Sequence, residues 1–329
     1  MRVALVFDME GTSHIDDVRE PFPMYREYWE SGRAKLTNDV VAATKGLLKG
    51  GATEVWILNH HGAGDVDWPN IIVERLPDRA RLADDWGKQG MRDQVDAMFQ
   101  VGAHARGGSP TFLSHTLTPG MRLRFEDELL SESHWWAWTG NVPVLGIVGS
   151  QALGDERGSL GDVPFLAVQR SVGRDHAEPV LGSPAETAAA IEGFAAAAIR
   201  EAGARRIATP AGPIRLQASL QNGDDAAPVM ADAGWSRLSR TEFVIEAEGW
   251  RGEGEVIDTG IYAAAAAAYP PYGFWFDNLD ASSQEAAMAF PPDRLARSDA
   301  ILRSWSADRP PLWFEPSAAD EPWEGFQAA

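Results

Sequence analysis

Two acidic residues follow directly on an apolar run near the N-terminus. The segment VALVF (residues 3–7) predicts a buried strand, and Asp8 and Glu10 come immediately after it. Residues two apart in an extended chain point to the same side, so the two carboxylates would repel each other there. A divalent cation between them is the simplest compensation, and an exposed turn facing water is the alternative that these residues leave open.

Histidines stand at the ends of two further apolar runs. His60 and His61 follow EVWILN (54–59), and His104 ends the run AMFQVGAH, with His115 in the loop beyond it. Open α/β sheets bind ligands at the carboxyl ends of their strands, so we expect these imidazoles close to the two carboxylates. Neighbours in an extended chain point in different directions, so only one of His60 and His61 is expected to bind a metal. The strand pattern alone leaves open which one.

The residue types narrow the choice of metal. The chain has no cysteine, so any metal must be held by imidazole nitrogen and carboxylate oxygen. A mixed nitrogen and oxygen set suits zinc, and also manganese or cobalt. Such a site carries out hydrolytic chemistry in many enzymes.

Composition limits the number of domains, the location and the partners that the protein can have. The 329 residues are 44% hydrophobic, which allows one large domain or two modest ones. No run of about 18 apolar residues predicts a membrane span, and the N-terminal apolar stretch is too short for a signal peptide, so we expect a cytoplasmic protein. The formal net charge of -19 and the lack of a basic patch argue against a nucleic-acid partner.

Apolar runs alternate with helical patterns over the first two thirds of the chain. This rhythm predicts an α/β fold with a mostly parallel sheet flanked by helices, which we assign to residues 1–210 as the metal-binding catalytic domain. One helix is expected to be capped by Thr37 and to end at Gly50 and Gly51. Another is expected to begin at Ser183 and Pro184.

The pattern changes after residue 210. IRLQASLQN alternates apolar and polar residues, as a half-exposed strand does, and EFVIEAEGW has a similar character. We therefore expect a smaller α+β portion over residues 211–269. Residues 270–329 are rich in Trp, Pro and acidic residues, which predicts an irregular C-terminal extension.

Four motifs in order give the chain a family resemblance. They are VFDMEG, GATEVWILNHHG, FQVGAHARGG with LSHT, and SESHWWAWTGNVPVLGIVG. Together they resemble the M55 family of metallopeptidases, which includes zinc-dependent D-aminopeptidases of the DppA type. The resemblance covers residues 1–200 and extends more weakly to about residue 265. It implies a metal-dependent aminopeptidase that hydrolyses short peptides or amino-acid amides, including those with D-residues, in a homo-oligomer.

The resemblance also implies roles for individual residues. It implies two zinc ions per chain, with Asp8 bridging them and Glu10 binding one. The histidine directly before glycine is the family's ligand, which selects His61, and His104 matches a ligand of the second ion. His115 matches the family's catalytic histidine. His60 departs from the serine that is usual at its position.

The fifth ligand has two candidates. Glu132 in LSESHW matches the family's glutamate at the start of a helix, although the stretch to NVPV is about one turn short. Glu128 fits only with a one-residue insertion, so Glu132 is preferred. Two other functions stay open: the same site acting on a different amide or ester, and a metal-binding protein without catalysis.

Overall fold

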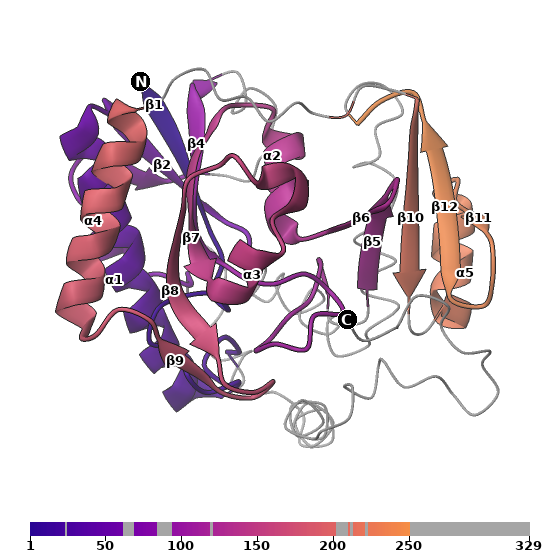
Figure 1. Ribbon diagram of the computed structural model, residues 1–329, viewed down its shortest axis with the longest axis horizontal. Helices are drawn as coiled ribbons and strands as arrows, with labels where there is room; N and C mark the ends of the chain where they lie inside the picture. The colour runs from indigo at the N-terminus through magenta and orange to yellow at the C-terminus, as the bar shows by residue number, and fades with distance from the viewer. Residues whose placement is uncertain are drawn as a thin grey trace.

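The computed structural model describes residues 1–23, 25–61, 69–83, 94–118, 121–201, 210, 213–220 and 223–250. They form two β-sheets with helices packed against them, which confirms the predicted α/β class (Figure 1). The predicted irregular extension over residues 270–329 lies outside the described part of the chain. Among the described residues, no helix is both long enough and apolar enough to span a lipid bilayer.

Seven strands form the larger sheet, in the order β3-β2-β1-β4-β7-β8-β9. Every neighbouring pair is parallel except β8 and β9. The strands are β1 (Arg2–Phe7), β2 (Glu54–Asn59), β3 (Ala80–Leu82), β4 (Ala97–Ala103), β7 (Val144–Ser150), β8 (Phe165–Ser171) and β9 (Ala177–Pro179). The mostly parallel sheet predicted from the apolar runs is therefore present.

The helices are α1 (Arg26–Gly50), α2 (Glu132–Gly140), α3 (Gln151–Asp155), α4 (Pro184–Arg200) and α5 (Gly223–Asp232), with short 3-10 turns η1 (Val73–Arg75) and η3 (Gly158–Leu160). The start of α4 is as predicted: the Ser183 hydroxyl accepts the backbone N–H of Glu186, whose carboxylate accepts the N–H of Ser183 in return. The predicted helix start at Thr37 is wrong. Thr37 lies inside α1, where its hydroxyl donates to the carbonyl of Arg33 at 2.6 Å.

Alternate residues of β1 pack on opposite faces of the larger sheet. Val3, Leu5 and Phe7 join the core under α1 and α4, while Ala4 and Val6 join the core that contains α2. A strand covered on both faces needs apolar residues throughout, which is why the N-terminal run shows no alternation. Figure 1 shows α1 and α4 together on one side of this sheet and α2 on the other.

Two glycines allow α1 and α4 to approach each other closely. A Cβ at Gly46 would overlap the carbonyl oxygen of Glu192, and one at Gly50 would overlap the side chain of Ile199. Both partners belong to α4. At these points the backbone of α1 therefore packs directly against α4, with no larger side chain between the two helices.

The smaller sheet is antiparallel, in the order β11-β12-β10-β5-β6. Its strands are β5 (Met121–Phe125), β6 (Glu128–Leu130), β10 (Ile214–Leu220), β11 (Ser236–Arg237) and β12 (Glu242–Ala247). Two of them, β5 and β6, precede residue 210, so this sheet takes strands from both sides of the predicted division between residues 1–210 and 211–269. That division stays a prediction.

An aromatic cluster joins α2 to the smaller sheet. The rings of Trp135 and Trp138 in α2 meet the Trp250 ring edge-on, with centroids 5.3 and 4.9 Å apart. Phe125 of β5 contacts Trp138 in the same manner at 5.4 Å. Because α2 follows β6 directly, this packing fixes where the first residue of α2 lies relative to both sheets.

Candidate metal centre

Strand register brings the sequence-predicted residues to one edge of the larger sheet. Phe7, the last residue of β1, pairs with Asn59 of β2 and with Val101 of β4. All three strands run the same way, so the residues that follow them leave the sheet side by side. From β1 the chain first adds β2 and β3 on one side and then crosses to add β4 and β7 on the other. Open α/β sheets bind ligands at the strand where the direction of this addition changes.

Two glycines let the loops after β1 and β4 touch. The N–H of Gly11 donates to the carbonyl of Gly102 at 2.8 Å. A Cβ at Gly11 would collide with the carbonyl oxygen of Ala103, and one at Gly102 with that of Asp8. Gly102 also has a φ of +76°, which larger residues adopt at a cost. This backbone contact holds Asp8 next to the loop that begins with His104.

Asp8 directs its two oxygens at two different histidines. Oδ1 lies 3.2 Å from Nδ1 of His61, and Oδ2 lies 3.2 Å from Nε2 of His104. Glu10 adds a third contact, because its Oε2 lies 3.0 Å from the same His61 nitrogen. Both carboxylates are buried. A carboxylate placed between two imidazoles in this way is arranged to bridge a pair of cations.

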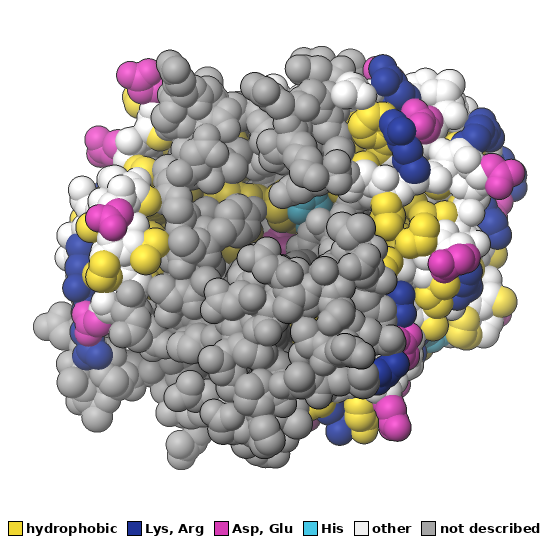
Figure 2. All heavy atoms as spheres, turned by 180° about the vertical axis from the view of Figure 1, so that it is seen from behind, with side chains coloured by type: hydrophobic (Ala, Val, Ile, Leu, Met, Phe, Trp, Pro, Cys, Tyr) yellow, Lys and Arg dark blue, Asp and Glu magenta, His cyan; other side chains and the backbone are white. Residues whose placement is uncertain are grey.

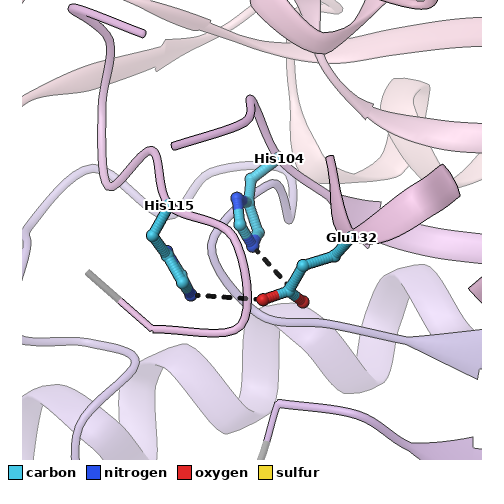
Figure 3. A group of neighbouring side chains, drawn as sticks. All are labelled: His104, His115 and Glu132. Atoms are coloured by element: carbon cyan, nitrogen blue, oxygen red, sulfur yellow. Dashed lines mark ion pairs between the residues drawn. The ribbon is translucent and has the colours of Figure 1, made fainter. Parts of the chain in front are cut away.

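Glu132 and His115 complete the group (Figure 3). Glu132 is the first residue of α2, and its two oxygens lie 3.6 Å from Nε2 of His115 and 3.7 Å from Nε2 of His104. The rings of His104 and His115 stack with centroids 4.2 Å apart. The donor atoms of His104, His115 and Glu132 lie within 4.8 Å of one another, as do those of Asp8, Glu10 and His104.

Backbone carbonyls hold the far nitrogen of each imidazole. Nε2 of His61 lies 2.6 Å from the carbonyl of Pro21, Nδ1 of His104 lies 2.9 Å from that of Ala105, and Nδ1 of His115 lies 2.8 Å from that of Leu113. A carbonyl only accepts, so the held nitrogen carries a hydrogen, and the other nitrogen faces the carboxylates as the one that a metal would bind. Metal-binding histidines are held in this way.

One nitrogen in the group supports a metal site in particular. Nε2 of His104 is buried and lies 3.2 Å from Oδ2 of Asp8, yet no oxygen in the described part of the chain meets it with hydrogen-bond geometry. A buried nitrogen of this kind is costly unless something binds it. Nitrogen and oxygen donors without sulfur suit zinc, so the residues present fit this metal.

The electrostatics of the group also favour a cation. Burial opposes charge on Asp8, yet His104 and His61 hold the pKa of its carboxyl well below the usual range. Burial and the charge of Asp8 raise the pKa of both Glu10 and Glu132. The neighbouring carboxylates raise the pKa of His61 and His104 well above the usual value despite burial. Protons therefore compensate the carboxylates in the metal-free protein, and a divalent cation would displace them.

His115 differs from the other two histidines. Burial, and then the charge of His104, lower its pKa to about 4. Its ring is thus neutral near pH 7, with the hydrogen on Nδ1 and the lone pair on Nε2. This is the state in which an imidazole accepts a proton.

The two alternative candidates contact other side chains. The ring of His60 lies against the indole of Trp136, with centroids 3.5 Å apart. Glu128 faces His134, whose Nε2 is 3.0 Å from its Oε1, and it accepts the N–H of Ser159. The placement therefore favours His61 and Glu132, and the assignment of metal ligands itself stays a prediction.

A small cleft opens beside the group. Asp8, His104 and Glu132 line it together with His60 and Trp136. Seen from behind, histidine and acidic side chains show together near the middle of the molecule, with hydrophobic side chains beside them (Figure 2). The pocket offers a place where a substrate can meet the carboxylates.

Sequence reasoning missed several residues that hold the group in place. The side chain of Asn59 accepts the N–H of His61 at 3.1 Å, and the N–H of Leu117 donates to Oε1 of Glu132 at 2.8 Å. Pro21, Leu113 and Leu117 act through their backbones, which leave no signal in the residue type. Asn59 could have been noticed as a polar residue that ends an apolar strand.

Comparison with known proteins places the chain among peptidases. A family model, Peptidase_M55, described as D-aminopeptidase, matches residues 1–253. A D-aminopeptidase of Bacillus subtilis (strain 168) is 27% identical over 184 residues, which are 53% of this chain and 65% of the relative. The matched stretch therefore spans just under two thirds of that relative.

A solved structure shares the fold. It is described as the Zn-dependent D-aminopeptidase DppA from Bacillus subtilis, a self-compartmentalizing protease. It superposes with a TM-score of 0.67 at 21% identity, covering 82% of this chain and 97% of the other.

Proposed function

Because the chain belongs to the M55 peptidase family, we propose that it is a zinc-dependent aminopeptidase that hydrolyses short peptides or amino-acid amides, including those with D-residues. The observation that carries the proposal is the position of Asp8 between His61 and His104. A buried carboxylate that serves two imidazoles, with further carboxylates beside it, is suited to a pair of zinc ions.

Five residues would hold the two ions. Asp8 would bridge them, Glu10 and His61 would bind one, and His104 and Glu132 would bind the other. When bound, zinc supplies Lewis acidity, which activates a water molecule and polarises the carbonyl under attack. The spacing of the donor atoms and the position of Nε2 of His104 beside Asp8 and Glu132 support this arrangement.

His115 would move protons during hydrolysis. The carbonyl of Leu113 holds its Nδ1 hydrogen and fixes the ring, so that Nε2 faces Glu132. From there Nε2 can take a proton as water attacks and return it to the departing amine. Its ring stacks on that of His104, which keeps it beside the reacting atoms.

We also propose that the protein works as a homo-oligomer that admits only small peptides. The support is the similar structure described as self-compartmentalizing. Gel filtration with light scattering tests this point. A monomer at micromolar concentration would contradict it without bearing on the metal centre.

The experiment that tests the function combines metal content with activity. Protein purified without added metal is analysed for zinc and then assayed on a D-alanyl dipeptide, an L-alanyl dipeptide and an amino-acid amide. We expect about two zinc ions per chain and hydrolysis of the D-peptide, with His115→Ala losing turnover while keeping its zinc. Zinc without hydrolysis of any substrate would indicate a metal-binding protein, and hydrolysis of the amide alone would indicate a different substrate class.

A further inference from the structure

A glutamine of β8 reaches the loop that carries Glu10. Nε2 of Gln169 lies 2.9 Å from the carbonyl oxygen of Glu10, and 3.2 Å from those of Thr12 and Ile15. The glutamine side chain is fully buried. In the sheet, β4 and β7 separate β1 from β8, so the loop crosses the ends of two strands to make this contact.

The geometry fixes which end of the amide faces the loop. Carbonyl oxygens only accept, so three of them around one atom require the NH₂ group there. The other end, Oε1, is then buried and has no hydrogen-bond partner among the described residues. An unpaired buried acceptor is unfavourable, and an apolar side chain would not carry that cost.

The same loop is held from the other side by α1. The N–H and the hydroxyl of Ser13 donate to the two carboxylate oxygens of Asp39, at 2.8 and 2.7 Å. Gln169 supplies hydrogens to the loop, whereas Asp39 supplies acceptors. The carbonyl of Glu10 itself, however, is held by Gln169, so the glutamine has the direct effect on where the Glu10 carboxylate points.

We propose that Gln169 is a positioning residue for zinc binding: it fixes the backbone of Glu10 so that the carboxylate stays 3.0 Å from Nδ1 of His61. The proposal rests on the proposed function, since it concerns the same metal centre. Partners that orient a metal ligand typically contribute 10–100-fold to metal affinity. Loss of the amide should therefore weaken zinc binding more than it weakens folding.

The test compares Gln169→Met with Val168→Ala. Methionine keeps the length of the side chain and removes the donor. Val168 is the preceding residue of β8, is fully buried, and packs in the core under α1 and α4, so its truncation lowers stability without touching the loop. For each variant we would measure zinc affinity by chelator competition, urea unfolding of the metal-free protein, and the visible spectrum of the Co²⁺ form.

We expect Gln169→Met to bind zinc at least about tenfold more weakly and to show an altered Co²⁺ spectrum. We expect Val168→Ala to be less stable yet to bind zinc within about twofold of wild type. Gln169→Asn, which keeps the amide but shortens its reach, should lie between wild type and Gln169→Met. If Gln169→Met does not fold, Gln169→Asn takes its place in the comparison with Val168→Ala.

Two outcomes separate this proposal from the proposed function. If wild type binds zinc and Gln169→Met binds it equally well with an unchanged Co²⁺ spectrum, the positioning role is wrong and the aminopeptidase proposal stands. If wild type itself binds no zinc, the proposed function fails and the positioning role fails with it. Equal losses of zinc affinity in Gln169→Met and Val168→Ala would also overturn the role, because stability alone would then explain them.

Discussion

Oδ2 of Asp8 lies 3.2 Å from Nε2 of His104, and the two residues follow neighbouring parallel strands. The contact depends on the loops that leave β1 and β4, because each loop could instead turn away from the other. Gly11 and Gly102 join them through a backbone hydrogen bond in a space that excludes any side chain. The metal centre thus depends on two residues that have no chemistry of their own.

Alanine at Gly102 should separate these loops. The new Cβ would meet the carbonyl of Asp8, and the positive φ adds strain, so we expect a loss of about 2–4 kcal/mol in the free energy of unfolding and a loss of zinc. Gly193→Ala is the control, because this exposed glycine lies within α4 with open space around it and alanine there should stabilise by about 0.5–1 kcal/mol. Urea titrations and zinc analysis check both variants. Unchanged zinc content in Gly102→Ala would contradict the role of the loop contact.

Alanine at His61 should abolish binding of one zinc ion. Its Nδ1 faces both Asp8 and Glu10, so its loss removes a donor, takes away the imidazole partner of Glu10 and leaves Asp8 with His104 alone. His60→Ala, next to it in the chain, should keep both ions because the His60 ring lies on Trp136 instead. Metal analysis of the two variants decides between the neighbouring histidines, and the reverse result would reassign the ligand.

Glutamine at Glu132 should weaken zinc binding and activity together, because its carboxylate faces both His104 and His115. Glutamine at Glu128 should leave both unchanged and affect stability alone. His134 and the Ser159 N–H lower the pKa of Glu128 to about 2 despite partial burial, so its stabilising charge is present above pH 4.5 and is lost as the pH falls toward 2. The stability advantage of wild type over Glu128→Gln in urea unfolding should therefore be full above pH 4.5 and shrink as the pH falls toward 2.

Stability should fall with rising pH through Asp39. Burial raises the pKa of this carboxyl to about 6, although its hydrogen bonds from Ser13 act in the opposite direction. A raised pKa means that the protonated form is favoured by folding, so its contribution is full below the unfolded value of 3.8 and is lost as the pH rises through about 6. Over that range wild type should lose about 3 kcal/mol relative to Asp39→Asn, since one pKa unit corresponds to about 1.4 kcal/mol.

Urea unfolding of metal-free protein at pH 4, 5, 6 and 7 measures the difference between Asp39→Asn and wild type. The asparagine keeps an acceptor for the Ser13 N–H, so the variant should fold. A constant difference across the series would show that Asp39 ionises at its ordinary pKa in the folded protein.

The strands that carry the centre were accessible from sequence, for a physical reason. A parallel strand covered on both faces must be apolar throughout, so the first polar residue after it marks the edge of the sheet. Asp8, His61 and His104 all stand just beyond such an edge. Placement at the carboxyl ends of neighbouring strands then follows from the α/β class.

The residues that hold the centre were not accessible in this way. Glu128 and Glu132 both stand near the start of a helix, and only the path of the chain through β6 turns one toward His134 and the other toward His104. Gln169 is the first of three polar residues that end β8, and its residue type does not mark it out from Arg170 and Ser171. The start of α1 was misplaced because charged residues before Thr37 interrupt the apolar period, although the helix continues through them.

Because α1 and α4 pack so closely, mutations between them can affect the edge of the sheet where Asp8 and His104 lie. Any added volume at Gly46 or Gly50 must push the two helices apart, and both rest on the sheet whose strands end at Asp8 and His104. A sub-ångström tilt of those strands would alter the distance between donor atoms that a metal pair requires. Random mutagenesis followed by a screen for loss of activity should therefore recover substitutions between α1 and α4. These positions lie on the opposite face of the sheet from α2 and do not line the pocket.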